Sequence, residues 1–80
     1  MWYYMTKYSF DPTKSVFGPF NTEEDAWRAM EQSADEEYRI DVEEKGWPTT
    51  IRKDKECGEI TIKNVFVNDT DATEFFLFEI

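Results

Sequence analysis

The stretch NTEEDAWRAMEQSADEEYRIDVEEKGWP, residues 21–48, contains the one long helical pattern of the chain. Its apolar side chains recur every three or four residues, a spacing that places them along one face of a helix. They are Ala26, Trp27, Met30, Ala34, Tyr38 and Val42. Acidic residues at 23–25 would lie in the first turn, where the helix dipole favours negative charge. The pattern predicts a helix over residues 22–45.

Capping residues mark both ends of this helix. Asn21 is a favourable N-cap, and Glu24, three residues later, completes an arrangement close to a capping box. Gly46 can adopt the left-handed conformation that ends a helix, and the proline two residues later prevents continuation. Trp47 would follow as the C″ residue and pack on Val42, as in a Schellman motif. These signals make the helix the best-defined element of the sequence.

Alternating and aromatic segments on both sides of the helix predict β-strands. The expected strands cover residues 2–10, 15–17, 49–54, 59–68 and 74–80. Turns are expected at 11–14, 55–58 and 68–71, and the Gly18-Pro19 pair is expected to end the second strand.

The last strand indicates how the sheet is arranged. Residues 75–78, Phe-Phe-Leu-Phe, are apolar on both faces, so we expect this strand in the middle of the sheet, paired with the first strand. The polar strand at 49–54 fits an edge. The sequence therefore predicts a single α+β domain over residues 1–80. It has an antiparallel four- to five-stranded sheet with one long helix packed on one face, in the order ββαβββ.

Length and composition agree with one small domain. Eighty residues bury a limited core, but 3 Trp, 4 Tyr and 7 Phe supply large apolar side chains. Cys57 is the only cysteine, so no internal disulfide can form. Proteins without disulfides are typical of a reducing compartment. No apolar run approaches the roughly 20 residues that span a bilayer. We expect a cytoplasmic protein with no signal peptide and no membrane partner.

Charge restricts the classes of partner. The chain has 18 acidic and 9 basic residues, a net charge of −9. Nucleic-acid binding normally depends on Lys and Arg that neutralise phosphates, so we expect no direct binding to DNA or RNA. Two interpretations of the acidity stay open. Either the acidity keeps a small aromatic-rich protein soluble, or the acidic residues form a surface that binds a basic partner.

The sequence shows no arrangement typical of an enzyme. The absence of histidine removes the usual Ser-His-Asp and Cys-His mechanisms. Cys57 lies near Lys53 and Lys55, which could lower its pKa, but an ordinary thiol is the simpler interpretation. Acid–base catalysis by two carboxylates requires a shaped pocket, for which a one-helix domain offers little room. We expect no catalytic residue and no enzymatic activity.

One loop has some resemblance to a calcium-binding loop. Residues 68–74 place oxygen-bearing side chains at alternate positions. If Asp69 is the first ligand, however, Glu74 occupies the position that requires glycine, and Ile80 the position of the bidentate glutamate. A polar turn is the better interpretation, and no metal or cofactor is expected.

The acidic residues of the helix form the candidate protein-binding surface. Its members are Glu23, Asp25, Glu31, Asp35, Glu36, Glu43 and Glu44. Their spacing could imitate that of phosphates. Arg28 and Arg39 follow acids at i,i+4 and neutralise part of this face. Asp41 projects near the middle of the apolar stripe. Either the stripe drifts where the helix leaves the sheet or Asp41 has a partner, and we favour the first interpretation.

The second candidate surface is the sheet face that the helix leaves open. One helix covers only one face of a four- or five-stranded sheet. Aromatic residues such as Tyr3, Phe76 and Phe78 could form a patch on the other face. A homodimer through that face is the alternative function, because a small structural or assembly protein could associate in this way.

In type, the chain resembles the small acidic proteins of phages and mobile elements, including anti-CRISPR and anti-restriction inhibitors. The resemblance covers the whole chain and lies in its size, acidity, compact α+β plan and lack of catalytic motifs, with no family motif. It implies an inhibitor that imitates DNA and occupies the DNA-binding surface of a nuclease or other nucleic-acid-binding protein. Residues 18–26 are also similar to the hairpin-to-helix junction of integrase arm-binding domains. Those domains are basic, so we interpret the junction as common helix-start chemistry.

Overall fold

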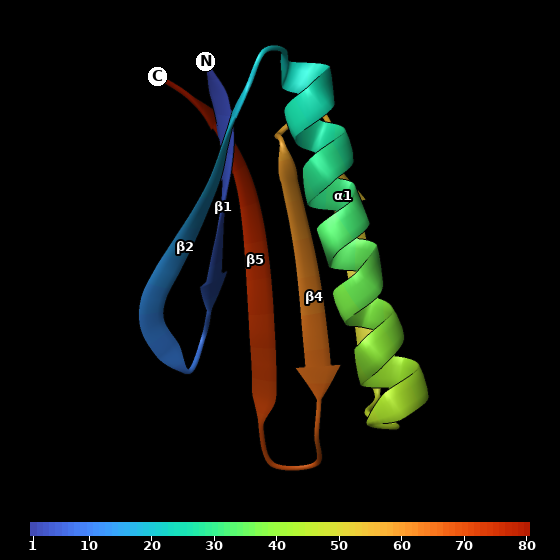
Figure 1. Cartoon of the computed structure of the whole chain (residues 1–80). Helices are drawn as coiled ribbons and strands as arrows, with labels where there is room; N and C mark the ends of the chain where they lie inside the picture. The colour runs from blue at the N-terminus through green and yellow to red at the C-terminus, as the bar shows by residue number, and fades with distance from the viewer.

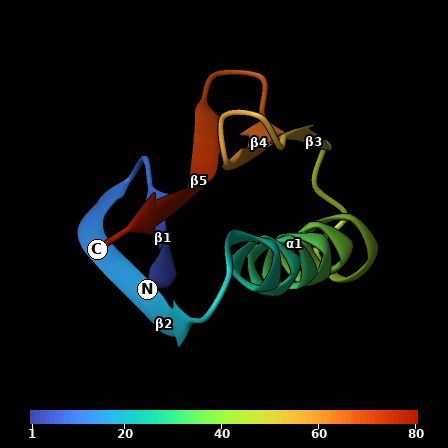
Figure 2. The same ribbon diagram turned by 90° about the horizontal axis from the view of Figure 1, so that it is seen from above.

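The computed structural model describes residues 1–80 as a five-stranded antiparallel sheet with one long helix on one face (Figures 1 and 2). The elements in chain order are β1 (Trp2–Tyr8), β2 (Asp11–Phe20), α1 (Glu23–Arg39), the π-helical segment η1 (Ile40–Glu44), β3 (Thr49–Asp54), β4 (Glu59–Val65) and β5 (Thr70–Glu79). The strand order is β2-β1-β5-β4-β3. The predicted α+β fold, in the order ββαβββ, is confirmed.

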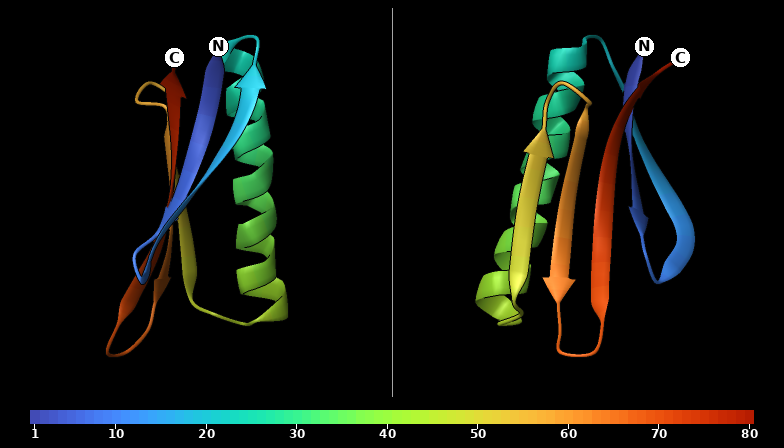
Figure 3. Two further views of the ribbon diagram at one scale, coloured as in Figure 1. Left: turned by 60° about the vertical axis from the view of Figure 1, so that its left-hand side comes forward. Right: turned by 180° about the vertical axis from the view of Figure 1, so that it is seen from behind.

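The central position of β5 is also confirmed, as is its pairing with β1. It lies between β1 and β4 and pairs with both in antiparallel register. Phe75 faces the helix and is 2% exposed, whereas Phe76 faces the open side and is half-buried. β3 lies at one edge, as its polar sequence predicts, and β2 lies at the other. The strands twist across the sheet, and the left-hand view of Figure 3 shows the β1–β2 hairpin running obliquely across β5.

The core lies between α1 and the sheet. Its buried apolar members are Tyr4, Trp27, Met30, Ala34, Ile60, Ile62 and Phe75. Three of them come from the predicted helical stripe, and the others alternate along β1, β4 and β5. Tyr4 keeps its hydroxyl within hydrogen-bond distance of Ser33 Oγ, at 2.9 Å, so this buried ring retains a polar partner.

The helix begins one residue later than predicted. Thr22, not Asn21, is the N-cap, with extended backbone angles, and its Oγ1 accepts a hydrogen bond from the Asp25 N–H at 3.1 Å. Asp25 thus takes the N3 position that the sequence analysis assigned to Glu24. Both Asn21 and Thr22 are acceptable caps, and the connection from the end of β2 selects the second.

The helix ends in a wider turn that the sequence pattern did not indicate. Gly46 has a φ of 66°, as expected for a residue that ends a helix. The Trp47 N–H, however, donates to the Asp41 carbonyl at 2.9 Å rather than to that of Val42. The additional residue in this turn shifts the buried face by one position. Asp41 is therefore 4% exposed and Val42 38% exposed, the reverse of the predicted stripe.

The strand boundaries in two hairpins, β1–β2 and β4–β5, differ from the prediction. β1 ends at Tyr8, and the turn is Ser9-Phe10 rather than residues 11–14. β2 runs through Gly18-Pro19, where a register shift opposite β1 accommodates the irregular backbone. Proline is tolerated there because β2 is an edge strand, which needs no partner on its outer side. β4 also ends earlier and β5 begins earlier than predicted, at Val65 and Thr70.

Candidate functional site

Five of the seven predicted acidic residues come together on α1 and η1, where they share two cations. Glu31 and Asp35 lie 3.0 and 2.9 Å from Lys53 Nζ of β3. The other three, Glu36, Glu43 and Glu44, converge on the Arg39 guanidinium at 2.7, 3.3 and 3.0 Å. The remaining two, Glu23 and Asp25, lie exposed in the first turn of the helix, away from these groups.

The ion pairs leave this surface negative. Arg39 faces three carboxylates and Lys53 faces two, so neither cation neutralises its partners. Hydrogen bonding from Arg39 lowers the pKa of Glu36, which stays ionised at neutral pH. The carboxylates raise the pKa of Arg39 in turn. Exposed pairs of this kind contribute little to stability, so the carboxylates can exchange partners easily.

The open face of the sheet has a different charge. Residues 23–44 contain ten acidic residues and two arginines. By strand register, the open face has four of the 9 basic residues and three of the 18 acidic residues. The basic residues are Lys7, Lys14, Arg52 and Lys63, and the acidic ones are Asp54, Glu59 and Glu74. The negative charge of the protein is therefore concentrated on the helix side.

An aromatic patch lies on this open face, near the chain termini. Tyr3 stacks on Phe78 with ring centroids 5.5 Å apart, and Lys7 Nζ lies 5.8 Å from the centroid of the Phe76 ring. Gly18 of β2 packs so closely on Tyr3 that an added Cβ would lie 2.6 Å from its ring. These rings are half-buried among themselves, with no helix above them. The rings named from the sequence therefore gather on this face, where each is partly exposed.

A third site was missed by the sequence analysis. A pocket of about 260 Å³ lies between the end of the helix and the sheet, at the end of the molecule opposite the termini. Asp41 lies on its inner side, where its Oδ2 accepts a hydrogen bond from Asn64 Nδ2 at 3.0 Å. The interpretation of Asp41 as a drifting residue was wrong, because the side chain is buried and has a specific partner.

Negative charge gathers in this pocket. Burial, and then the negative charge of Asp41, raise the pKa of Glu37, one helical turn earlier. Burial, and then the charges of Glu37 and Asp41, raise the pKa of Tyr8 at the end of β1. Two acids at i,i+4 on the inner helix face were the signal in the sequence, but only the fold shows that they meet Tyr8.

Cys57 is an exposed thiol in the turn between β3 and β4. This agrees with the ordinary surface thiol that the sequence analysis preferred. The neighbouring lysines do not lower its pKa, because a hydrogen bond with Asp54, and then the charge of Asp54, raise it. Lys53 and Lys55 instead reach across to acids of the helix. The thiol is therefore a weak nucleophile at neutral pH.

Replacing Asp54 should activate this thiol. In Asp54→Asn the acceptor charge is lost, so the thiol pKa falls and more thiolate forms at mildly alkaline pH. We expect iodoacetamide to alkylate Cys57 severalfold faster than in the wild type, measured by mass spectrometry over time. Glu56→Gln, which removes a neighbouring exposed acid, serves as the control and should change the rate little. Equal acceleration in both variants would contradict the role of Asp54.

No group of three or more Cys, Asp or Glu side chains is arranged to hold a metal ion. The helix is neither long enough nor apolar enough to cross a membrane. Comparison of the chain with models of protein families, with curated proteins and with solved structures finds no match.

Proposed function

We propose that this chain is a non-enzymatic protein-binding module that docks its acidic helix side on a basic protein surface. The partner surface that suits these carboxylates is the DNA-binding surface of a nuclease or other nucleic-acid-binding protein. The module would act there as an inhibitor. The observation that supports this most is the concentration of ten acidic residues in residues 23–44, against two arginines.

The arrangement of the acids suits such a contact. Carboxylates grouped on one rigid helix create a field that speeds encounter with a basic surface. Their present partners, Arg39 and Lys53, are exposed and shared among several acids, so exchange for a partner's Lys or Arg costs little. A DNA-binding surface displays such cations at the spacing of phosphates.

A triple amide variant tests this surface. In Glu31→Gln, Asp35→Asn and Glu36→Gln together, we expect partner binding to weaken about tenfold or more, mainly through slower association. Amides are preferable to charge reversal, because Lys53 and Arg39 would repel new lysines. Far-ultraviolet circular dichroism should show the helix intact.

The matched control removes three acids elsewhere. Glu56, Glu59 and Glu79 are exposed, lie outside the helix and have no ion pair. Their replacement by Gln changes the net charge equally, so binding should stay near the wild-type value. Equal weakening in both variants would show that only total charge matters, and unchanged binding in both would remove the helix side from consideration.

The alternative function is a small assembly protein that forms a homodimer through the open sheet face. The stacked Tyr3–Phe78 pair and the half-buried Phe76 favour it, because an apolar patch of this kind marks interfaces. The homodimer predicts a different result from the acidic binding module. The mass in solution would exceed the 9.6 kDa of one chain and would persist at high salt, since apolar contacts are not screened.

A further inference from the structure

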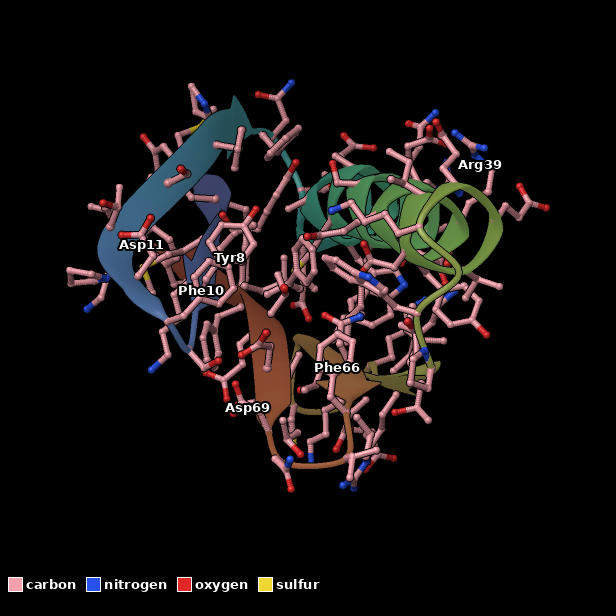
Figure 4. All side chains as sticks on the ribbon, turned by 90° about the horizontal axis from the view of Figure 1, so that it is seen from below. Tyr8, Phe10, Asp11, Arg39, Phe66 and Asp69 are labelled. Carbon is pink, nitrogen blue, oxygen red and sulfur yellow. The ribbon has the colours of Figure 1, made fainter.

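The pocket at the end of the helix combines aromatic walls with buried carboxylates. Tyr8 and Phe10 form one wall, with ring centroids 5.6 Å apart. Trp47 forms another and is held in place by the edge of Phe66 at 5.5 Å. In the view from below, the labelled Tyr8 and Phe10 lie next to each other, and Phe66 lies apart from them (Figure 4). Aromatic faces beside a carboxylate are the surroundings that stabilise an organic cation.

The polar part of the pocket is rigid. Asp41 and Asn64 are 4% and 5% exposed, and Asn64 Nδ2 also donates to Thr49 Oγ1 at 3.0 Å. This hydrogen bond and the one to Asp41 fix the amide, which in turn fixes the carboxylate of Asp41. Thr73, also buried, lies near Glu37 on the neighbouring helical turn, and its hydroxyl lowers the pKa of that carboxyl. The carboxylates are therefore positioned before any ligand arrives.

The chain's own lysine shows where a cation would lie. Lys45 Nζ is 3.7 Å from Asp41 Oδ1 and 4.3 Å from the centroid of the Trp47 ring. Its side chain is 46% exposed, so it can leave this position for solvent. One ammonium also does not balance the carboxylates of Glu37, Asp41 and Asp71 that line the pocket. A second cation, or a replacement for Lys45, would be favoured there.

We infer that this pocket binds an alkylammonium or guanidinium group, which lies between the Asp41 carboxylate and the Trp47 ring and displaces Lys45. The volume of about 260 Å³ is slightly below the roughly 300–1,000 Å³ of drug-sized ligand sites, so it suits a group of side-chain size. The group comes from a free small amine or from a Lys or Arg side chain of a polypeptide. The site lies apart from the outer acids of the helix and does not depend on the proposed function.

A titration followed by nuclear magnetic resonance tests this inference. The probes are N-acetyl-lysine N-methylamide, N-acetyl-arginine N-methylamide and n-butylammonium, and N-acetyl-norleucine N-methylamide is the uncharged control. We expect the cations to shift the Trp47 indole N–H signal saturably and the uncharged amide to leave it unchanged. The signal of Trp27, which is buried in the core, should stay in place. Binding by n-butylammonium as tight as by the amino-acid amides assigns the site to small amines, and tighter binding by the amides assigns it to polypeptide side chains.

Single substitutions in the pocket should change the affinity for the probes in opposite directions. Asp41→Asn keeps an oxygen that accepts from Asn64 but loses the charge, so probe binding should weaken about tenfold. Glu37→Gln, on the pocket rim, should weaken binding in the same direction and serves if Asp41→Asn unfolds. Lys45→Gln removes the internal competitor and should strengthen binding. Glu43→Gln, exposed on the outer side, is the matched control and should change nothing.

Three results would overturn the inference. They are the absence of a saturable Trp47 shift with every cation, weaker binding in Lys45→Gln, or equal losses in Asp41→Asn and Glu43→Gln. None of these outcomes bears on the acidic helix side, because no partner protein is present in the experiment.

Discussion

Phe75→Ala is expected to lower the free energy of unfolding by about 3–5 kcal/mol, the usual cost of removing a buried phenylalanine. Phe75 is 2% exposed and lies on the central strand, where it packs under the helix between Thr6 and Ile60 of the neighbouring strands. The loss is a large share of the roughly 5–15 kcal/mol that stabilise a typical domain. Urea unfolding followed by circular dichroism gives the difference directly.

The neighbouring residue provides the control. Phe76 is the same residue type on the same strand, but it faces the open side and is half-buried. Phe76→Ala should therefore cost clearly less than Phe75→Ala. An equal cost, especially one that grows with protein concentration, would show that the open face is buried in a dimer and would support the alternative function.

Asn64→Ala should lower the free energy of unfolding by about 2–3 kcal/mol, because it removes a hydrogen bond to a buried charge. Asp41 would keep only Lys45, at 3.7 Å, as a charged partner within 4 Å. Thr49 Oγ1 would lose its donor from Asn64 as well. Thermal unfolding at neutral pH measures the effect.

Two further variants isolate the cause of this loss. Asn68→Ala, an exposed asparagine in the loop after β4, should change stability by less than about 0.5 kcal/mol. The pair Asn64→Leu with Asp41→Leu removes both polar groups together and should be more stable than Asn64→Ala alone. A double variant that is less stable than Asn64→Ala would show that the polar pair itself, and not the uncompensated charge, stabilises this end of the molecule.

Local signals in the sequence were sufficient for most of the fold. The apolar spacing from Ala26 to Ala34 and the glycine at 46 predicted the helix, and the apolar run at 75–78 predicted a central strand. These predictions succeed because each depends on neighbours in the chain. The N-cap was missed because Asn21 and Thr22 are both suitable caps, and only the connection from β2 decides between them.

The pocket could not be predicted for a related reason. Its residues come from β1 and the turn after it, from α1, η1 and the loop after η1, and from β4 and β5, so they meet only once the sheet order is known. The π-helical segment shifts the buried face by one residue, and no propensity in residues 40–44 indicates such a turn. The acidic surface could be predicted only in part. Its residues were identified from the sequence, but the sharing of Lys53 between Glu31 and Asp35 depends on where β3 lies.

The most direct test of the proposed function is capture of a partner from bacterial lysate on the tagged protein. Bound proteins are eluted with a salt gradient and, in parallel, with excess duplex DNA, and both eluates are identified by mass spectrometry. We predict release of a nucleic-acid-binding protein by moderate salt and by DNA, and its loss from the triple amide variant of residues 31, 35 and 36. Recovery of the protein alone, at a dimer mass that salt does not change, would contradict the account and point to the open aromatic face of the sheet.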